Sequence, residues 1–165
     1  LIAQGDADAR AGIRLSGADM IIGGLLKQDI PADEKGNIGV NSNIKGFAFE
    51  YMTNGRGLVL GDPGPWICAG MTGGVIYLRY QPERGLNKDA LQRRIAKGAL
   101  VSIEKLTDTG VKDVTELLSQ YMSILGSNGQ KAEAEELALL LENPAQNFIQ
   151  IVPVKEHADP SVSTE

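Results

Sequence analysis

The sequence predicts a mainly β fold, a single-stranded β-solenoid with a C-terminal α-helical cap, on three observations. Sixteen of the 20 glycines lie at or before Gly85, and the pattern beyond that residue becomes helical. Four glycines recur at a constant spacing of 19 residues: Gly17, Gly36, Gly55 and Gly74. Repeats near this length, with short strands and tight corners, are typical of solenoids.

The glycine-rich half is expected to form the solenoid over residues 1–85. Residues 58–60 and 75–78 read as short strands, since both runs are apolar and contain β-branched residues. Each run follows a glycine, and "YMTNGRGLVL" and "GMTGGVIYL" share Met-Thr, then glycine, then apolar residues. Glycine adopts a positive φ at low steric cost, so we interpret these positions as the corners at which the coil turns.

The second half, residues 86–155, is expected to pack on the solenoid within one domain. Asn87 is a good N-cap for a helix that ends before Gly98. The apolar spacing then predicts a strand, two helices and a closing strand, in that order, over residues 100–106, 111–125, 131–142 and 148–152. Residues 156–165 read as a loose polar tail.

Composition excludes several classes of function. The chain of 165 residues has a formal net charge of −5 and no stripe of Lys and Arg, which argues against nucleic-acid binding. No apolar run approaches the roughly 20 residues that span a bilayer, and no signal peptide is evident. Cys68 is the one cysteine, so no internal disulfide can form, and we expect a cytoplasmic protein.

Two segments closely resemble the most specific motifs of a known family. "EYMTNGRGLVLG" and "AGMTGGVIYL" resemble motifs of the GXGXG domain, the C-terminal domain of the glutamate synthase large (alpha) subunit. The likeness extends in order over nearly the whole chain, from "GDADARAGIRLSGADMIIGG" to "NFIQIVP". The structural motif residues are Gly17, Gly36, Glu50, Tyr51, Met52, Thr53, Gly55, Gly57, Gly61, Gly70, Met71, Gly73 and Gly74.

The resemblance implies a right-handed β-helix without catalytic residues. In the family this domain braces a glutaminase domain against a synthase domain that carries FMN and an iron–sulfur cluster. It implies that those modules are the partners, that the cofactors lie in them and not in this chain, and that the assembly is of the glutamate synthase type, making glutamate or a related amino acid. A scaffold like the one found in formylmethanofuran dehydrogenase, where the same fold forms a separate polypeptide, is an alternative.

The residues themselves offer no catalytic set. Cys68 as a nucleophile needs a base, but the one histidine, His157, lies in the polar tail. No G-x-S-x-G elbow is present, and Ser16, Ser42 and Thr72 lack an identifiable histidine partner. We therefore expect no catalytic residue and interpret Cys68 as a buried core residue.

Cofactor and metal sites are equally unsupported. The glycines from Gly55 to Gly61 have the spacing G-x-G-x-x-x-G, and no helical pattern follows to bind a pyrophosphate. Asp6 and Asp8 do not recur as a calcium-binding repeat would require, and no Cys/His set fits zinc or iron–sulfur ligation.

Two further expectations complete this interpretation. The alternative class of function is a stand-alone β-solenoid binding protein or enzyme, although the carboxylates of the glycine-rich half do not recur at the 19-residue step. These carboxylates are Asp19, Asp29, Asp33, Glu34, Glu50 and Asp62. We also expect the strand edge around residues 13–22 to be covered by another domain, a partner subunit or a second copy in a homo-oligomer.

Overall fold

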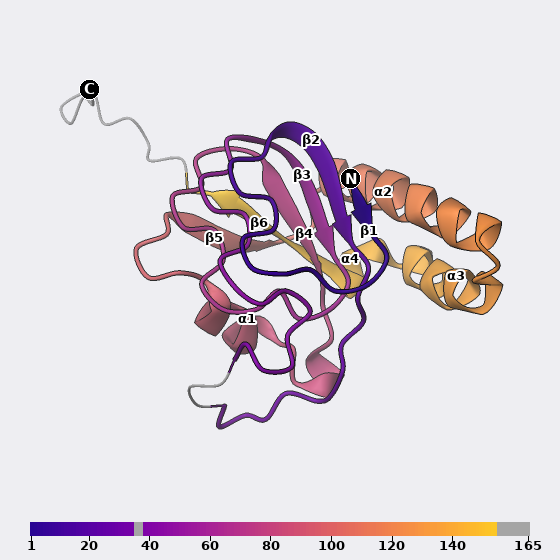
Figure 1. The fold of residues 1–165 in the computed structure, drawn as a ribbon, viewed down its shortest axis with the longest axis horizontal. Coiled ribbons are helices and arrows are strands. Elements are labelled where there is room, and N and C mark those ends of the chain that lie inside the picture. Colours follow the sequence, from indigo (N-terminus) through magenta and orange to yellow (C-terminus); the bar gives the residue numbers. More distant parts are fainter. Residues whose placement is uncertain (35–37, 155–165) are drawn as a thin grey trace.

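The computed structural model describes residues 1–34 and 38–154. Three of the positions singled out above fall outside the described residues: Gly36, His157 and the tail 156–165. Over the described part, the chain folds around a six-stranded sheet with helices on both sides (Figure 1).

The sheet is mixed, with four parallel strands followed by two antiparallel ones. In spatial order its strands are β1 (Ile2–Ala3), β2 (Ser16–Ile22), β3 (Asn54–Val59), β4 (Val75–Arg79), β6 (Phe148–Pro153) and β5 (Val101–Lys105). Strands β1 to β4 pair in parallel, whereas β6 runs antiparallel to both β4 and β5. The strands expected near 58–60, 75–78, 100–106 and 148–152 are therefore all present.

The predicted fold class is nevertheless wrong. A mainly β right-handed β-helix with a helical cap was expected, but the chain has a mixed α/β architecture built on one mixed sheet. Strands β5 and β6 do not cap the sheet; they extend it, with Ile76 opposite Ile151 and Ile103 opposite the same residue. The connections between the parallel strands contain turns and isolated bridges rather than further ladders, because many of their non-glycine residues take a positive φ, which the strands show only at Gly17 and Gly55.

The helices follow the predicted pattern closely. They are α1 (Lys88–Arg94), α2 (Asp108–Ser127), α3 (Lys131–Ala138) and α4 (Pro144–Asn147), with 3₁₀ turns η1 (Pro82–Arg84) and η2 (Leu139–Glu142). The predicted N-cap of α1 is confirmed, since Asn87 Oδ1 accepts a hydrogen bond from Ala90 N at 2.9 Å. Thr107 caps α2 in the same way through Gly110 N.

One face of the sheet is covered by the long helix α2 and its neighbour α3 (Figure 1). The side chains that alternate to this face along the strands meet the apolar stripe of α2 and Leu137 of α3. This core comprises Ile21, Leu58, Leu60, Tyr77, Val114, Leu117, Leu118, Tyr121, Leu125, Leu137 and Phe148.

The opposite face of the sheet is covered by the connecting segments and by α1. Strand residues such as Ile22, Val59 and Ile76 pack there against side chains from the connections after β2 and β3. The main contributors from these connections and from α1 are Ile44, Ala48, Phe49, Met52, Ile67, Cys68, Ala90 and Leu91. Since this face is closed by irregular backbone, its polar groups must find partners within the connections.

The edge formed by β2 is partly covered by the chain itself. Ile21 N donates to Leu1 O at 2.9 Å, and Gly23 N donates to Ala3 O at 2.8 Å. The expectation that another domain, a partner subunit or a second copy covers residues 13–22 stays a prediction. Among the described residues, no helix combines the length and the apolar character needed to cross a membrane.

Candidate functional site

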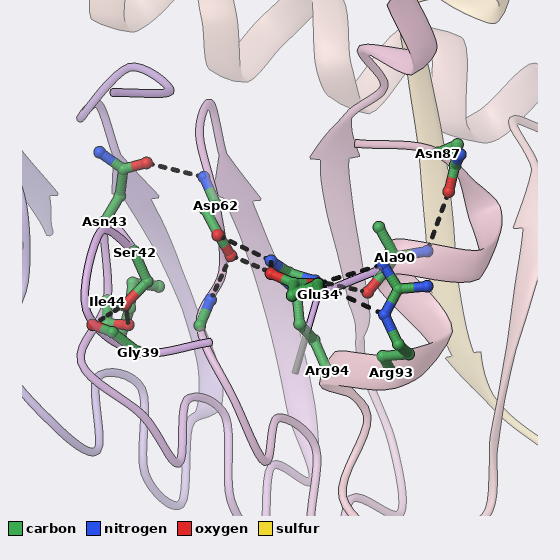
Figure 2. A network of polar contacts seen from close by, with 11 residues as sticks. Glu34, Gly39, Ser42, Asn43, Ile44, Asp62, Asn87, Ala90, Arg93 and Arg94 are labelled. Carbon is green, nitrogen blue, oxygen red and sulfur yellow. Dashed lines mark hydrogen bonds and ion pairs between the residues drawn. The ribbon is translucent and has the colours of Figure 1, made fainter. Parts of the chain in front are cut away.

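A buried ionic cluster lies on the face of the sheet that the connecting segments cover (Figure 2). Its members are Glu34, Asp62 and Arg94, which we call the Arg94 cluster. The Arg94 side chain is fully buried, and the side chains of Asp62 and Glu34 are only 6% and 11% exposed. Charged groups are almost never buried this completely unless they are paired.

Local structure brings the three residues together. Arg94 ends α1, one turn after Ala90, whose carbonyl accepts a hydrogen bond from Arg94 Nη1 at 2.8 Å. Asp62 begins the "DPGP" turn after β3, and its Oδ1 accepts from Gly64 N at 2.9 Å. Glu34 comes from the long connection after β2, so the cluster joins three segments that are distant in sequence.

The donors of Arg94 are fully used. Nε and Nη2 donate to the two oxygens of Asp62 at 2.7 and 3.0 Å. Nη1 and Nη2 donate to the two oxygens of Glu34 at 3.0 and 2.7 Å. A guanidinium has five N–H donors, and these contacts together with the Ala90 carbonyl account for all five. The cluster therefore has no donor left for a substrate.

The Glu34 carboxylate is held in its charged form. Burial raises the pKa of Glu34, but hydrogen bonds and charge from Arg94 and Arg93 outweigh it, so the net pKa is lowered. A general acid needs the opposite shift, towards neutral pH. The electrostatics thus fit a structural ion pair rather than a proton donor.

A shallow pocket opens beside the cluster. Its volume is about 310 Å³, and Glu34 and Asp62 lie in its wall together with apolar side chains such as Leu26, Ile30 and Val40. The two carboxylates already bind Arg94, which leaves the pocket without an unpaired charge from the cluster.

A polar network extends from Asp62 toward the N-terminal segment. Asn43 Oδ1 accepts from Asp62 N at 2.7 Å (Figure 2), and Asn43 Nδ2 donates to Asp6 Oδ1 and to Leu25 O, both at 2.8 Å. The amide thereby links three successive connections. The motif residue Gly61 makes this possible, because a Cβ there would lie 2.0 Å from Asn43 Oδ1.

A second ionic cluster, which we call the Arg56 cluster, joins α2 to the sheet. Arg56 on β3 contacts Asp19 on β2 at 2.7 Å, and Asp113 and Glu116 on α2 at 3.0 and 3.2 Å. Hydrogen bonds to Asp19 and then Glu116 raise the pKa of Arg56. Tyr77 donates to Asp113, and burial followed by this hydrogen bond raises the pKa of its phenol. This cluster also satisfies its own charges.

The candidate nucleophiles are poorly placed for catalysis. Cys68 is fully buried, and burial raises its thiol pKa to about 12. The hydroxyl of Ser42 donates to backbone carbonyls, at 2.6 Å in the case of Ile44. Over residues 1–34 and 38–154, no group of three or more His, Cys, Asp or Glu side chains is placed to hold a metal ion.

Most of the described motif residues lie at the starts of β3 and β4 and in the turns before them, whereas Gly17 lies in β2 and Gly61 follows β3. Gly55 and Gly74 directly precede the paired residues Arg56 and Val75, and Gly17 lies where the register between β2 and β3 shifts. All three glycines have a positive φ. Met52 and Met71 are buried, whereas Thr53 is exposed and Tyr51 is half exposed. Close backbone approach accounts for Gly73, because a Cβ there would lie 2.0 Å from Thr53 O.

The remaining motif residues surround aromatic rings and one carboxylate. A Cβ on Gly57 would lie 2.7 Å from the Phe49 ring, and one on Gly70 would lie 2.5 Å from the Tyr51 ring. Glu50 is largely buried and lies 3.7 Å from Arg10. Its Oε1 makes no hydrogen bond within the part of the chain that the structure describes.

Sequence reasoning missed Arg94, and it considered Glu34 and Asp62 only among the carboxylates of the glycine-rich half, which do not recur at the 19-residue step. A signal for Arg94 was present. It follows Ala90 by four residues and Leu91 by three, and both of these are buried, so Arg94 lies on the apolar face of α1. A charged residue on such a face indicates a buried ion pair, although its partners cannot be read locally.

The comparison with known proteins agrees with the motifs. The family model described as the GXGXG motif matches residues 33–154. The chain is 29% identical to the glutamate synthase [NADPH] large chain of Bacillus subtilis (strain 168) over 121 residues, which are 71% of this chain and 7% of that protein. It is 35% identical to the ferredoxin-dependent glutamate synthase of Antithamnion sp. over 112 residues, 66% of this chain and 6% of that protein.

The chain belongs to the GXGXG motif family, and it is similar in sequence to the corresponding region of glutamate synthases. It spans less than a tenth of the length of these two relatives.

Proposed function

We propose that this chain is a structural, non-catalytic GXGXG domain or subunit of a glutamate synthase-type assembly. The observation that carries the proposal is the family match over residues 33–154, together with relatives that are named as glutamate synthases and of which this region is a small part. In such an assembly the chain braces a glutaminase module against an FMN-binding synthase module, and the flavin and iron–sulfur cluster belong to the partners.

The chemistry of the described residues supports a bracing role. The Arg94 cluster and the Arg56 cluster each join segments from different parts of the chain and use their charges internally. Cys68 is buried as a thiol with a raised pKa. Such groups make the domain rigid, and rigidity is what a brace between two catalytic modules requires.

Reconstitution tests the proposal. The chain is purified alone and together with the glutaminase and synthase proteins encoded in the same genome, and complex formation is followed by gel filtration with light scattering. Glutamine-dependent formation of glutamate from 2-oxoglutarate is then measured with and without this chain. We expect a stable complex whose activity depends on the chain, whereas the isolated chain has no turnover and binds no flavin.

Three outcomes contradict the proposal. Stoichiometric flavin in the isolated chain, or turnover by the isolated chain, assigns chemistry to it. Failure of the chain to associate with either protein removes the bracing role.

A further inference from the structure

Three connecting segments share an unusual backbone pattern. In each of them every second residue has a positive φ: Arg10, Gly12 and Arg14, then Phe47, Phe49 and Tyr51, then Trp66, Cys68 and Gly70. Backbone hydrogen bonds join the segments in order, as in Phe49 N to Ala11 O at 2.7 Å and Cys68 N to Ala48 O at 2.9 Å. Residues at equivalent positions therefore lie beside one another and form three columns across the segments. The central column is Gly12, Phe49 and Cys68, and the two outer columns are Arg10, Phe47 and Trp66, and Arg14, Tyr51 and Gly70.

The outer columns contain aromatic residues whose positive φ is sterically unfavourable for a bulky side chain. A positive φ brings Cβ close to a carbonyl oxygen, so bulky residues seldom adopt it. Burial in the core compensates for this at Phe49, which is fully buried. Phe47, Tyr51 and Trp66 receive less compensation, because they are 37%, 53% and 53% exposed. We call Phe47 and Trp66, whose rings stack on one another, the aromatic surface. Unfavourable conformations of this kind concentrate at functional sites.

The rings of the aromatic surface are ordered by contacts with one another and with a cation. Phe47 and Trp66 stack with their centroids 5.0 Å apart and an angle of 21° between their planes. The Arg10 guanidinium lies 5.9 Å from the centre of the Phe47 ring. Such a preformed platform presents a large apolar area at low entropic cost, as the anchor residues of protein interfaces do.

The pocket beside the platform is lined by cations. A pocket of about 220 Å³ adjoins Trp66, and its two charged lining residues are the cations Lys45 and Arg93. Lys45 and Arg10 are mostly exposed, and their contacts with Asp8 and Glu50 are long, at 3.5 and 3.7 Å. Well-formed ionic hydrogen bonds are about 2.8 Å long. These two cations are thus available to a carboxylate from another molecule.

We propose that the aromatic surface is the docking site for an acidic segment of a partner protein. This inference rests on the proposed function, in which the partner is the glutaminase or the synthase protein. Apolar or aromatic side chains of that segment pack on Phe47 and Trp66, and its Asp or Glu side chains bind Lys45 and Arg10. A second copy of the same face would bring cations against cations, so charge complementarity favours an acidic partner.

The single tryptophan provides a direct test. Trp66 is the one tryptophan of the chain, so incorporation of 5-fluorotryptophan gives a single ¹⁹F resonance from the aromatic surface. The labelled chain is titrated with the glutaminase and synthase proteins encoded in the same genome. We expect the resonance to shift on complex formation. We also expect high salt to weaken the complex, because salt screens contacts between surface charges.

Variants locate the contact without relying on the label. Phe47→Ala combined with Trp66→Ala is expected to weaken the complex at least tenfold, and Lys45→Glu severalfold. Leu139→Ala is the matched control, since this apolar residue is 60% exposed in η2, away from the aromatic surface. Thermal unfolding of each free variant shows that it is folded before its affinity is measured.

Each outcome decides between the two proposals. A complex whose ¹⁹F resonance does not shift, or that tolerates the double variant as well as Leu139→Ala, overturns the docking site and leaves the proposed function intact. Loss of all association by the wild-type chain overturns both. A resonance that shifts with the concentration of this chain alone, accompanied by dimerisation in light scattering, assigns the surface to a second copy and contradicts an acidic partner.

Discussion

Arg94 and Asp62 form a buried bidentate ion pair, with Nε–Oδ1 and Nη2–Oδ2 distances of 2.7 and 3.0 Å. Their side chains are 0% and 6% exposed. The pair fastens the end of α1 to the turn that follows β3, and Glu34 completes it from a third segment. On the sheet face that the connecting segments cover, the core is closed by irregular backbone. The ion pair therefore fixes these segments in place, as backbone hydrogen bonds would in a strand ladder.

Removal of the Arg94 guanidinium is expected to be strongly destabilising. Arg94→Ala leaves two carboxylates buried without their main partner, which costs about 3–5 kcal/mol in the free energy of unfolding. Arg93→Ala is the matched control. The Arg93 side chain also binds Glu34, but it is 35% exposed, so its loss costs about 1 kcal/mol or less. Urea denaturation measures both, and an equal loss in the two variants would contradict a structural role for the buried pair.

Acid is expected to weaken the same cluster through Glu34. Burial raises the pKa of Glu34, but Arg94 and Arg93 lower it further than burial raises it, so the folded pKa lies below the unfolded value. The stabilisation is thus complete above the unfolded pKa of about 4.3 and is lost as the pH falls through the folded pKa. Unfolding free energies of wild type and Glu34→Gln are compared between pH 7 and pH 3. The advantage of wild type should shrink over that range, and a constant difference would refute the linkage.

Substitution of Gly74 is expected to disturb the junction between β3 and β4. Gly74 has a φ of +84°, and a Cβ there would lie 2.6 Å from Met52 Cε and 2.9 Å from Gly55 O. Gly74→Val is therefore expected to cost about 1–3 kcal/mol or more. Gly126→Ala in α2 is the control, because this substitution is expected to stabilise the protein instead. Its added methyl meets nothing within 4 Å, and alanine favours a helix by about 0.5–1 kcal/mol over glycine. A melting temperature of Gly74→Val at or above that of the wild type would disprove this account.

The Cys68 thiol is expected to be inert in the folded protein. It is fully buried, and burial raises its pKa to about 12, so neither access nor thiolate is available near neutral pH. Reaction with a chromogenic disulfide reagent at pH 8 should be negligible in buffer and rapid in concentrated urea, with one thiol per chain. Fast reaction of the native protein would show that the connecting segments open readily.

Local signals in the sequence predicted the elements well. Asn87 as an N-cap, the apolar stripe from Val111 to Leu125, and the strand patterns around Leu58 and Ile76 all depend on residues within a turn or two of one another. The 19-residue glycine spacing also carried real information. Gly55 and Gly74 immediately precede the paired residues Arg56 and Val75, so this 19-residue interval matches the register between β3 and β4.

The sequence by itself thus determined the helices α1 to α3 and the strands β3 to β6, because each follows from propensities and periodicities of neighbouring residues. Tertiary structure decided the rest. The pairing of Ile76 with Ile151 turned an expected cap into part of one mixed sheet, and no local pattern reveals a partner so distant in the chain. The same holds for Arg94, whose burial depends on Asp62 and Glu34 arriving from other segments, and for Phe47 and Trp66, whose backbone conformation is imposed by the stacked connections.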